Sequence, residues 1–354
     1  MNDQVYFIGY RPEQFTGWDG SGSASYTSVS ATNTIGPNNI GTISLTTSGN
    51  VLWKDLNITN LDPVYFCASL YAEFTTGNYG SIVITDGTNA IKIMSINPDD
   101  GNNDRLQLSI GTYDSTNRFT QVSSSIVYNN GSNSSIRERQ INFFLKFYSS
   151  DKIKYDTIDI CASSTVLPGV ISSVTTITLT NPFTSIKSMY SSYNSSNSIF
   201  YYCAVANFDL TGSYIDYTTV VSSGTFDGWS GTVSTLNTYP INSNVTTNGV
   251  YSYRVNDQIT FSPTKQLTSG TGMMAPKAVF IDSSLSTNEN GLGYSATSIV
   301  KNSSSSLTYS LGSTIVPSTT VTNYQWVSYQ NPSNLSDWSV SDVNSLEFGL
   351  KRIS

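Results

Sequence analysis

The segment Phe15-Thr-Gly-Trp18-Asp-Gly20 recurs far downstream as Phe226-Asp-Gly-Trp229-Ser-Gly231, with the shared pattern Phe-x-Gly-Trp-x-Gly. Each copy follows a strand-like run and precedes a stretch rich in Ser, Thr and Asn. Closely spaced glycines are typical of a tight corner, because glycine adopts backbone conformations that other residues disfavour. The recurrence suggests that one kind of structural unit is built twice.

The closing segments of the two halves also correspond. Ile141-Asn-Phe-Phe-Leu-Lys-Phe-Tyr-Ser149 aligns with Leu346-Glu-Phe-Gly-Leu-Lys-Arg-Ile-Ser354. We expect a divergent internal duplication, and the alternative is chance alternation in a sequence built from few residue types. A further similarity, between Tyr65-Phe-Cys-Ala and Tyr201-Tyr-Cys-Ala, places a strand of the same kind in the middle of the chain.

The length of 354 residues suits two domains, because single hydrophobic cores rarely grow beyond ~250–300 residues. We place a first β-sandwich domain at residues 1–165 and a second at residues 166–354. The middle segment, residues 151–215, contains strand-like runs that either close the first domain or open the second. Its assignment stays open at this point.

The composition favours strands. Only 12% of the residues are charged, whereas 23 Tyr, 15 Phe and 5 Trp supply material for cores. Clean alternation marks Leu106–Ile110 and Gln140–Phe147, and Asp86-Gly-Thr-Asn between two apolar runs predicts a hairpin. No long stretch has helical periodicity. We therefore predict an all-β chain of two tandem antiparallel β-sandwich domains of jelly-roll-like type.

The charge and the cysteines exclude several classes. A net charge of −7 argues against nucleic-acid binding, which depends on Lys and Arg contacts with phosphates. No apolar run approaches the ~20 residues that span a bilayer, and the N-terminus has no secretory signal pattern, so we expect no membrane insertion. Three widely spaced cysteines, Cys67, Cys161 and Cys203, predict buried free thiols and no disulfide framework.

The chain contains no histidine, which removes histidine-based acid–base and nucleophilic catalysis and the commonest zinc ligand. A glycosidase with paired carboxylates would have to use residues such as Asp19, Asp227, Glu73 or Asp209, but no pattern pairs them. Residues 100–104 resemble an ordinary Asx-rich turn more than a calcium loop. We predict no enzyme activity, no metal and no cofactor.

Tryptophans are the remaining candidates for a binding site. Trp18, Trp229, Trp326 and Trp338 could stack against sugar rings, and we single out Trp18 and Trp229 as possible glycan contacts. The competing interpretation is that Trp18 and Trp229 plug the ends of two equivalent sandwiches. The recurrence of their motif favours this second interpretation.

The segment Asn331-Pro-Ser-Asn-Leu-Ser-Asp-Trp338-Ser-Val-Ser-Asp342-Val-Asn344-Ser-Leu-Glu-Phe-Gly349-Leu-Lys-Arg resembles the closing motif of structural proteins of tailed-bacteriophage virions. The resemblance implies a jelly-roll-like domain in a component of the particle, whether fibre, tail or head decoration. It supplies no catalytic residues.

Two functions follow as hypotheses. The first is a non-enzymatic structural component of a bacteriophage particle that assembles with itself, as a homo-oligomer, and with other virion proteins. Its location would be the virion, after synthesis in the host cytoplasm. The second is a carbohydrate-binding adhesion module that recognises host-surface glycans.

Overall fold

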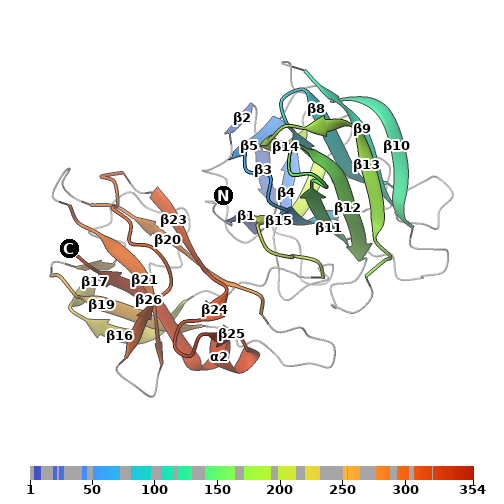
Figure 1. The fold of residues 1–354 in the computed structure, drawn as a ribbon. Helices are drawn as coiled ribbons and strands as arrows, with labels where there is room; N and C mark the ends of the chain where they lie inside the picture. The colour runs from blue at the N-terminus through green and yellow to red at the C-terminus, as the bar shows by residue number, and fades with distance from the viewer. Residues whose placement is uncertain are drawn as a thin grey trace. The chain divides into compact units, whose positions relative to one another are not determined.

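The structure is a computed structural model. It describes residues 4–8, 19–21, 24–27, 42–45, 51–71, 81–96, 105–114, 119–129, 140–163, 171–192, 198–212, 220–231, 250–252, 254–263, 276–287, 293–302, 307–320 and 322–354. These residues are almost entirely β-strands, and all paired strands run antiparallel (Figure 1). The chain divides into two compact units, residues 1–215 and 216–354. The predicted all-β fold is confirmed.

The first unit contains two large sheets. The eight-stranded sheet has the order β13 (Thr175–Phe183), β12 (Tyr155–Ser163), β11 (Gln140–Tyr148), β6 (Val64–Tyr71), β15 (Ser198–Ala206), β4 (Thr42–Leu45) and β3 (Ala24–Thr27), and β1 (Gln4–Ile8) also pairs with β15. The seven-stranded sheet has the order β10 (Phe119–Asn129), β9 (Arg105–Tyr113), β8 (Asn89–Ile96), β7 (Ser81–Thr85), β14 (Ile186–Ser192), β5 (Val51–Ile58) and β2 (Asp19–Ser21).

One apolar core joins these two sheets into a sandwich. Alternate residues of β11, namely Phe143, Leu145 and Phe147, pack in the same cluster as Ile91 and Ile93 of β8. Alternation follows from the pleat of a strand, which points successive side chains to opposite faces. Each fully buried Phe or Ile contributes roughly 1.5–3 kcal/mol through removal of apolar surface from water.

The predicted hairpin is confirmed. Strands β7 and β8 pair from Ser81 with Met94 to Thr85 with Ala90. Asp86 closes the turn, because its Oδ1 accepts hydrogen bonds from the backbone N–H groups of Thr88 and Asn89. Gly87 has φ of 97°, a conformation that favours glycine.

The middle segment belongs to the first unit. Strand β13 pairs with β12, β14 lies between β7 and β5, and β15 lies between β6 and β4. The division at residues 215 and 216 therefore differs from the expected boundary at residues 165 and 166. The reason is the strand order: β14 and β15 of the middle segment fill central positions in the two sheets of the first unit, and the sequence pattern alone does not reveal strand order.

The second unit is built on a five-stranded sheet. Its order is β16 (Val220–Asp227), β19 (Gln258–Pro263), β26 (Leu346–Arg352), β21 (Ala296–Asn302) and β22 (Thr308–Ser310). Three two-stranded sheets accompany it: β17 (Trp229–Gly231) with β18 (Val250–Ser252), β20 (Val279–Leu285) with β23 (Thr322–Ser328), and β24 (Gln330–Asn331) with β25 (Ser336–Asp337). Val279 and Ile281 of β20 pack with Val300 and Phe348, so the β20–β23 pair forms a second layer.

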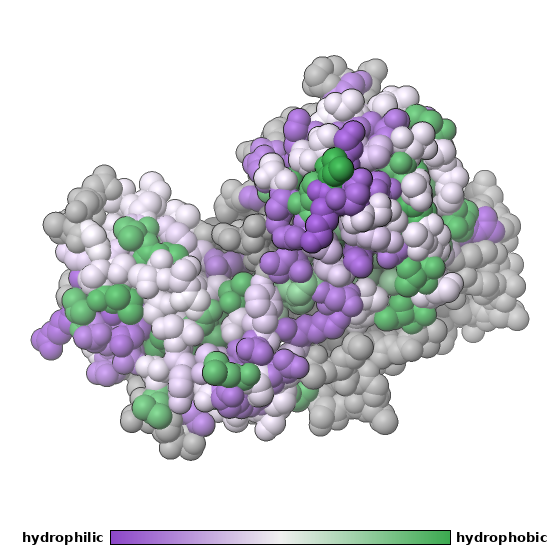
Figure 2. Space-filling view, viewed as in Figure 1, coloured by the Kyte–Doolittle hydropathy of each residue, from purple (hydrophilic) through white to green (hydrophobic). Residues whose placement is uncertain are grey.

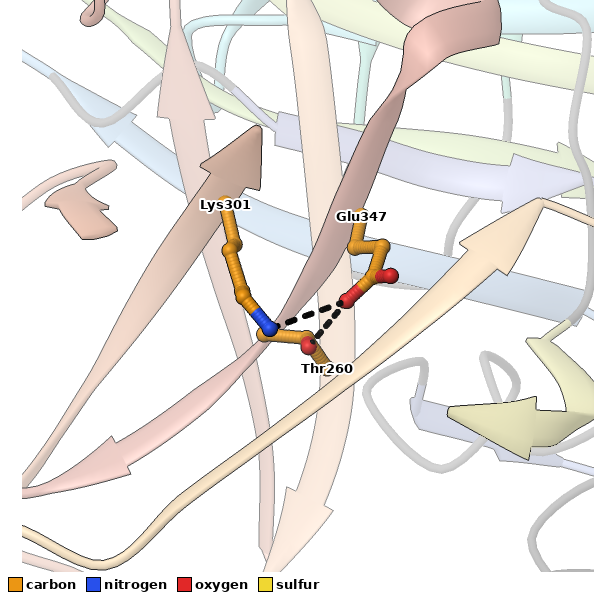
Figure 3. A network of polar contacts seen from close by, with 3 residues as sticks. All are labelled: Thr260, Lys301 and Glu347. Carbon is orange, nitrogen blue, oxygen red and sulfur yellow. Dashed lines mark hydrogen bonds and ion pairs between the residues drawn. The ribbon is translucent and has the colours of Figure 1, made fainter. Parts of the chain in front are cut away.

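A polar network links the central strands of this sheet (Figure 3). Thr260 of β19 donates a hydrogen bond from Oγ1 to Oε2 of Glu347 on β26. The Nζ of Lys301 on β21 lies 3.9 Å from the same oxygen. Because Lys301 and Glu347 are direct cross-strand partners, the ion pair reinforces the register between β21 and β26.

The segment that resembles a virion closing motif forms part of the second core. Trp338 is 1% exposed and packs with Leu346 and Phe348. Ser339 caps the six-residue helix α2 (Val340–Ser345), with Asp342 completing a reciprocal capping box. No helix among the described residues is long and apolar enough to cross a membrane.

The strands aligned at the ends of the two halves have different neighbours. Strand β11 lies between β6 and β12, whereas β26 lies between β19 and β21. Strand β6 pairs with β11 in the first unit, whereas β26 has no neighbours in its sheet other than β19 and β21 among the described strands. The sheet order thus differs between the units, and the internal duplication stays a prediction.

The three cysteines are free and buried, as predicted. Cys67 and Cys161 lie on β6 and β12, and Cys203 lies on β15, where its thiol is 3.6 Å from the sulfur of Met189. Burial raises the pKa of Cys161 to about 11, and the nearby carboxylates of Asp209 and Asp159 add to the shift.

Candidate functional site: the outer face of the seven-stranded sheet

One row of residues crosses the seven-stranded sheet on the face that points away from the core. Cross-strand pairing links, in order, Ser124, Ser109, Lys92, Val83 and Tyr190. The flanking residues Ile91 and Ile93 of β8 belong to the core, so Lys92 and its partners occupy the opposite face. We call this set the outer row.

An aromatic cluster adjoins the outer row and shares Tyr190 with it. Tyr113 and Phe119, which are cross-strand partners at the ends of β9 and β10, pack against Tyr190, Val83 and Ala90. The centroids of the Tyr113 and Tyr190 rings are 4.7 Å apart, with the planes tilted by 41°. Tyr113 and Phe119 are half-buried, and Tyr190 is 1% exposed. We call Tyr113, Phe119 and Tyr190 the aromatic cluster.

Gly111 makes room for this arrangement. A Cβ at this position would lie 2.1 Å from the carbonyl oxygen of Thr120 and 3.0 Å from the Phe119 ring. The absence of a side chain lets β10 approach β9 closely at a point where their register shifts between Gln121 and Ser123. The Phe119 ring therefore lies close over the sheet at Gly111.

The hydroxyl group of Tyr190 is unusual for a buried polar group. It has no hydrogen-bond partner among the described residues. A buried hydroxyl without a partner costs roughly 1–3 kcal/mol, so such groups normally meet water or a ligand. Burial raises the pKa of Tyr190, and the neighbouring Tyr113 and Asp114 raise it further.

Carboxylates stand near the aromatic cluster. The pKa of Tyr113 is raised first by burial and then by the carboxylates of Asp114 and Asp55, which lie close enough to disfavour a second negative charge. Asp55 and Asp114 are both exposed. Gln121 is also exposed, and its Oε1 accepts a hydrogen bond of 3.1 Å from Ser109. The face thus combines aromatic rings with exposed hydrogen-bonding groups.

Lys92 is the cation of the outer row. Its side chain is only 8% exposed, and its neighbours along the row are Val83 and Ser109. Burial lowers the pKa of its ammonium group. Lys92 makes no hydrogen bond or ion pair within the described part of the chain.

Comparisons with known proteins identify no family. No protein-family model matches the chain, and no curated protein matches it.

Several solved structures are similar at a low level. The CBM2 module of the evolved Dit protein of Lactobacillus casei BL23 phage J-1 has 11% identity and a TM-score of 0.35, covering 61% of this chain and 98% of that one. A legume lectin-like domain from Entamoeba histolytica has 13% identity and a TM-score of 0.35, covering 57% and 95%. An engineered GH43 glycoside hydrolase has 12% identity and a TM-score of 0.37, covering 57% and 40%. Likeness at this level transfers no ligand and no activity to this chain.

The tryptophans singled out from the sequence lie elsewhere. Trp18 is outside the described residues. Trp229 is half-buried on β17 in the second unit, where it pairs with Ser252, and its indole N–H is buried without a partner among the described residues. Trp229 thus shows features of both interpretations, glycan contact and core plug, and both stay predictions.

Two other tryptophans that the sequence offered as platforms are core residues. The Nε1 atoms of Trp326 and Trp338 donate hydrogen bonds of 2.9 Å to the carbonyl oxygens of Ser313 and Ser328. Both side chains are buried, so neither can stack against a sugar ring. The idea of platforms at Trp326 and Trp338 was wrong because the residue type alone does not show whether a tryptophan packs in the core or faces solvent.

The carboxylates considered as catalytic pairs are divided between the two units. Asp227 is exposed in the second unit, whereas Asp209 is exposed in the first and accepts a hydrogen bond from the backbone N–H of Thr211. Glu73 and the loop at residues 100–104 lie outside the described residues. Within the described ranges, no three His, Cys, Asp or Glu side chains are placed to hold a metal ion.

Sequence reasoning missed the aromatic cluster. Two of its members come from the consecutive strands β9 and β10, but the third comes from β14, which lies more than fifty residues further along the chain. The one available signal was Lys92 between Ile91 and Ile93 in the predicted hairpin, since a charged residue between two apolar ones marks the face opposite the core.

Proposed function

We propose that the chain is a non-catalytic glycan-binding protein and that the outer face of the seven-stranded sheet holds the sugar. The observation that carries the proposal is the buried Tyr190 hydroxyl without a partner, next to the half-buried Tyr113 ring. Sugars present apolar C–H faces and many hydroxyl groups. Binding sites for such ligands combine aromatic surface with a few oriented polar groups.

The residues around the aromatic cluster supply those groups. The Tyr113 ring offers an accessible apolar face, and the carboxylates of Asp55 and Asp114 can accept hydrogen bonds from sugar hydroxyls. Gln121 adds an exposed amide. The Tyr190 hydroxyl can donate to a ligand oxygen or accept from a ligand hydroxyl.

A glycan array probed with the full chain tests this proposal. We expect specific glycan binding that Tyr113→Ala abolishes, because the variant removes the accessible ring. Tyr65→Ala is the matched control, since Tyr65 lies on the outer face of the other sheet, beside Lys146. Absence of any glycan hit contradicts the proposal, as does binding that Tyr113→Ala leaves intact or that only Trp229→Ala abolishes. Hydrolysis of a bound glycan would refute the non-catalytic role.

A second proposal concerns the assembly in which the protein works. The residues that resemble a virion closing motif form part of the core and the central strand of the second unit, whereas the aromatic cluster belongs to the first unit. We propose that the second unit serves assembly into a bacteriophage particle, as a homo-oligomer or with other virion proteins. In the described parts of the face drawn in Figure 2, hydrophobic residues form small separate groups among polar ones.

Mass spectrometry of purified bacteriophage particles tests whether the protein is a component of them. A fixed copy number per particle and an oligomer in light scattering are the expected results. A protein that is monomeric and missing from particles contradicts this proposal and leaves the glycan-binding proposal untouched.

A further inference from the structure

We infer that the ligand of the outer face is an acidic glycan, whose anionic group is bound by Lys92. This inference rests on the proposed function and names its ligand class. Two donors on the outer row, the Lys92 ammonium and the Tyr190 hydroxyl, have no partner among the described residues. Two unused donors on one face call for a ligand rich in acceptors, and a carboxylate, sulfate or phosphate is the richest.

The position of Lys92 makes its unpaired charge informative. Nearly buried cations are normally compensated, because removal of a charge from water is costly unless a partner replaces the lost hydration. Even two lysines that are only half-buried have partners: Lys301 lies 3.9 Å from Glu347, and the Nζ of Lys146 lies 4.6 Å from the ring centroid of Tyr148. Lys92 lies between Val83 and Ser109 along the outer row, and neither carries a negative charge.

The two donors are spaced to serve one ligand. Lys92 and Tyr190 both pair with Val83, from opposite sides, so they lie two strands apart in the same row. Neighbouring strands are about 4.8 Å apart, which separates the two backbones by roughly 10 Å. Both side chains project from the same face, so a saccharide in contact with the aromatic cluster near Tyr190 can extend an acidic substituent along the row toward Lys92.

Because the surrounding charges are negative, the acidic group is attracted only at short range, by Lys92. The chain carries a net charge of −7, and Asp55 and Asp114 stand near Tyr113, so no long-range field attracts an anion. A contact between an acidic substituent and Lys92 is short-ranged and partly shielded from solvent. We therefore expect binding that weakens only moderately with added salt, in contrast to binding by an exposed basic patch.

The experiment uses the full chain and pairs of oligosaccharides. One member of each pair contains a uronic acid, and the other is the same oligosaccharide after reduction of the carboxyl group to the alcohol. We expect the acidic member to bind at least tenfold more tightly by isothermal titration calorimetry. A sulfated oligosaccharide is the third probe, and it shows whether the site accepts other anionic groups.

Two variants that each remove one positive charge are compared, Lys92→Met as the test and Lys154→Met as its control. Lys92→Met keeps the unbranched apolar part of the side chain, removes the charge and is expected to bring the acidic and reduced oligosaccharides to equal affinity. Lys154→Met removes an exposed lysine and should preserve the preference. A thermal unfolding curve of Lys92→Met confirms that the fold is intact.

The outcomes separate this inference from the proposed function. If both members of a pair bind equally to the unmodified chain, or if Lys92→Met retains the preference, the inference is wrong and the glycan-binding function stands. If no oligosaccharide binds at all, both are wrong.

Discussion

The ring of Tyr113 lies 4.7 Å from the ring of Tyr190, and only Tyr113 reaches solvent to a useful extent. The pair therefore divides into an accessible ring and a buried one. We expect Tyr113→Ala to destabilise the first unit by about 0.5–1.5 kcal/mol, the size of an aromatic pair interaction, and Tyr190→Ala by about 3–5 kcal/mol. Urea denaturation followed by circular dichroism measures both. Equal losses would contradict this division of roles.

The raised pKa of Tyr155 predicts that the folded chain loses stability at alkaline pH. Burial raises its pKa to about 12 from the ordinary value of 10.0, with a smaller contribution from Asp62, and its hydroxyl donates to the carbonyl oxygens of Asn60 and Asp62. Between pH 10 and 12 the unfolded chain therefore loses a proton that the folded chain keeps. The stability from this group is complete below pH 10 and is lost as the pH rises through 12.

The variant Tyr155→Phe tests this linkage. It should be less stable at neutral pH by roughly 0.5–1.5 kcal/mol, because the carbonyl oxygens of Asn60 and Asp62 lose the hydroxyl donor that they share. Its stability should also decline less steeply than that of the unmodified chain from pH 10 to 12. Thermal unfolding across this range gives both quantities, and parallel curves for the two proteins would count against the assignment.

Trp338 tests the structural role of the closing segment. Trp338→Phe removes the N–H that donates to the carbonyl oxygen of Ser328 at 2.9 Å, and it leaves a gap beside Phe348. We expect the second unit to lose about 2–4 kcal/mol, from a lost hydrogen bond and reduced packing. Calorimetry should show the unfolding transition of this unit at a lower temperature. Asp337→Ala, at an exposed neighbouring position, is the control and should change little.

Gly349 tests the close approach of two strands. A Cβ on this residue would lie 1.8 Å from the carbonyl oxygen of Ile259 on β19. Gly349→Ala must therefore push β26 away from β19, at a cost of about 1–3 kcal/mol or more. Denaturant unfolding measures the loss, with Ser310→Ala on the outer strand β22 as the control. A variant as stable as the unmodified chain would show that the strands are further apart than described.

The burial of the three cysteines predicts that their thiols react slowly in the folded chain. All three cysteines are buried, and burial raises the pKa values of Cys161 and Cys203. Because the thiolate is the reactive form, a thiol reagent at pH 8 should modify none of them in the folded chain and all three after denaturation. Rapid modification of any cysteine under native conditions would contradict their placement.

The sequence predicted much of the fold because local patterns report local structure. Alternation in Gln140–Phe147 and the Asp86–Asn89 turn identified β11 and the β7–β8 hairpin. The order of the strands within the sheets could not be predicted from the sequence. Strand β15 lies beside β6 although more than a hundred residues separate them, and no pattern in either strand encodes that pairing.

The candidate site depended on the same missing information. The alternation around Lys92 shows that it faces away from the core, but only the cross-strand register places it two positions from Tyr190. Conversely, the prominent tryptophans drew attention because the residue type is rare. Trp338 demonstrates that a rare residue can have a structural role, through packing and one hydrogen bond to the backbone.

The central position of β26 has a consequence for the order of events during synthesis. Strands β19 and β21 flank β26, so they have no common neighbour until residue 352 has left the ribosome. The first unit waits in the same way for β15, which joins β6 to β4. A translational pause before either strand emerges would therefore leave unpaired strand edges open to other nascent chains.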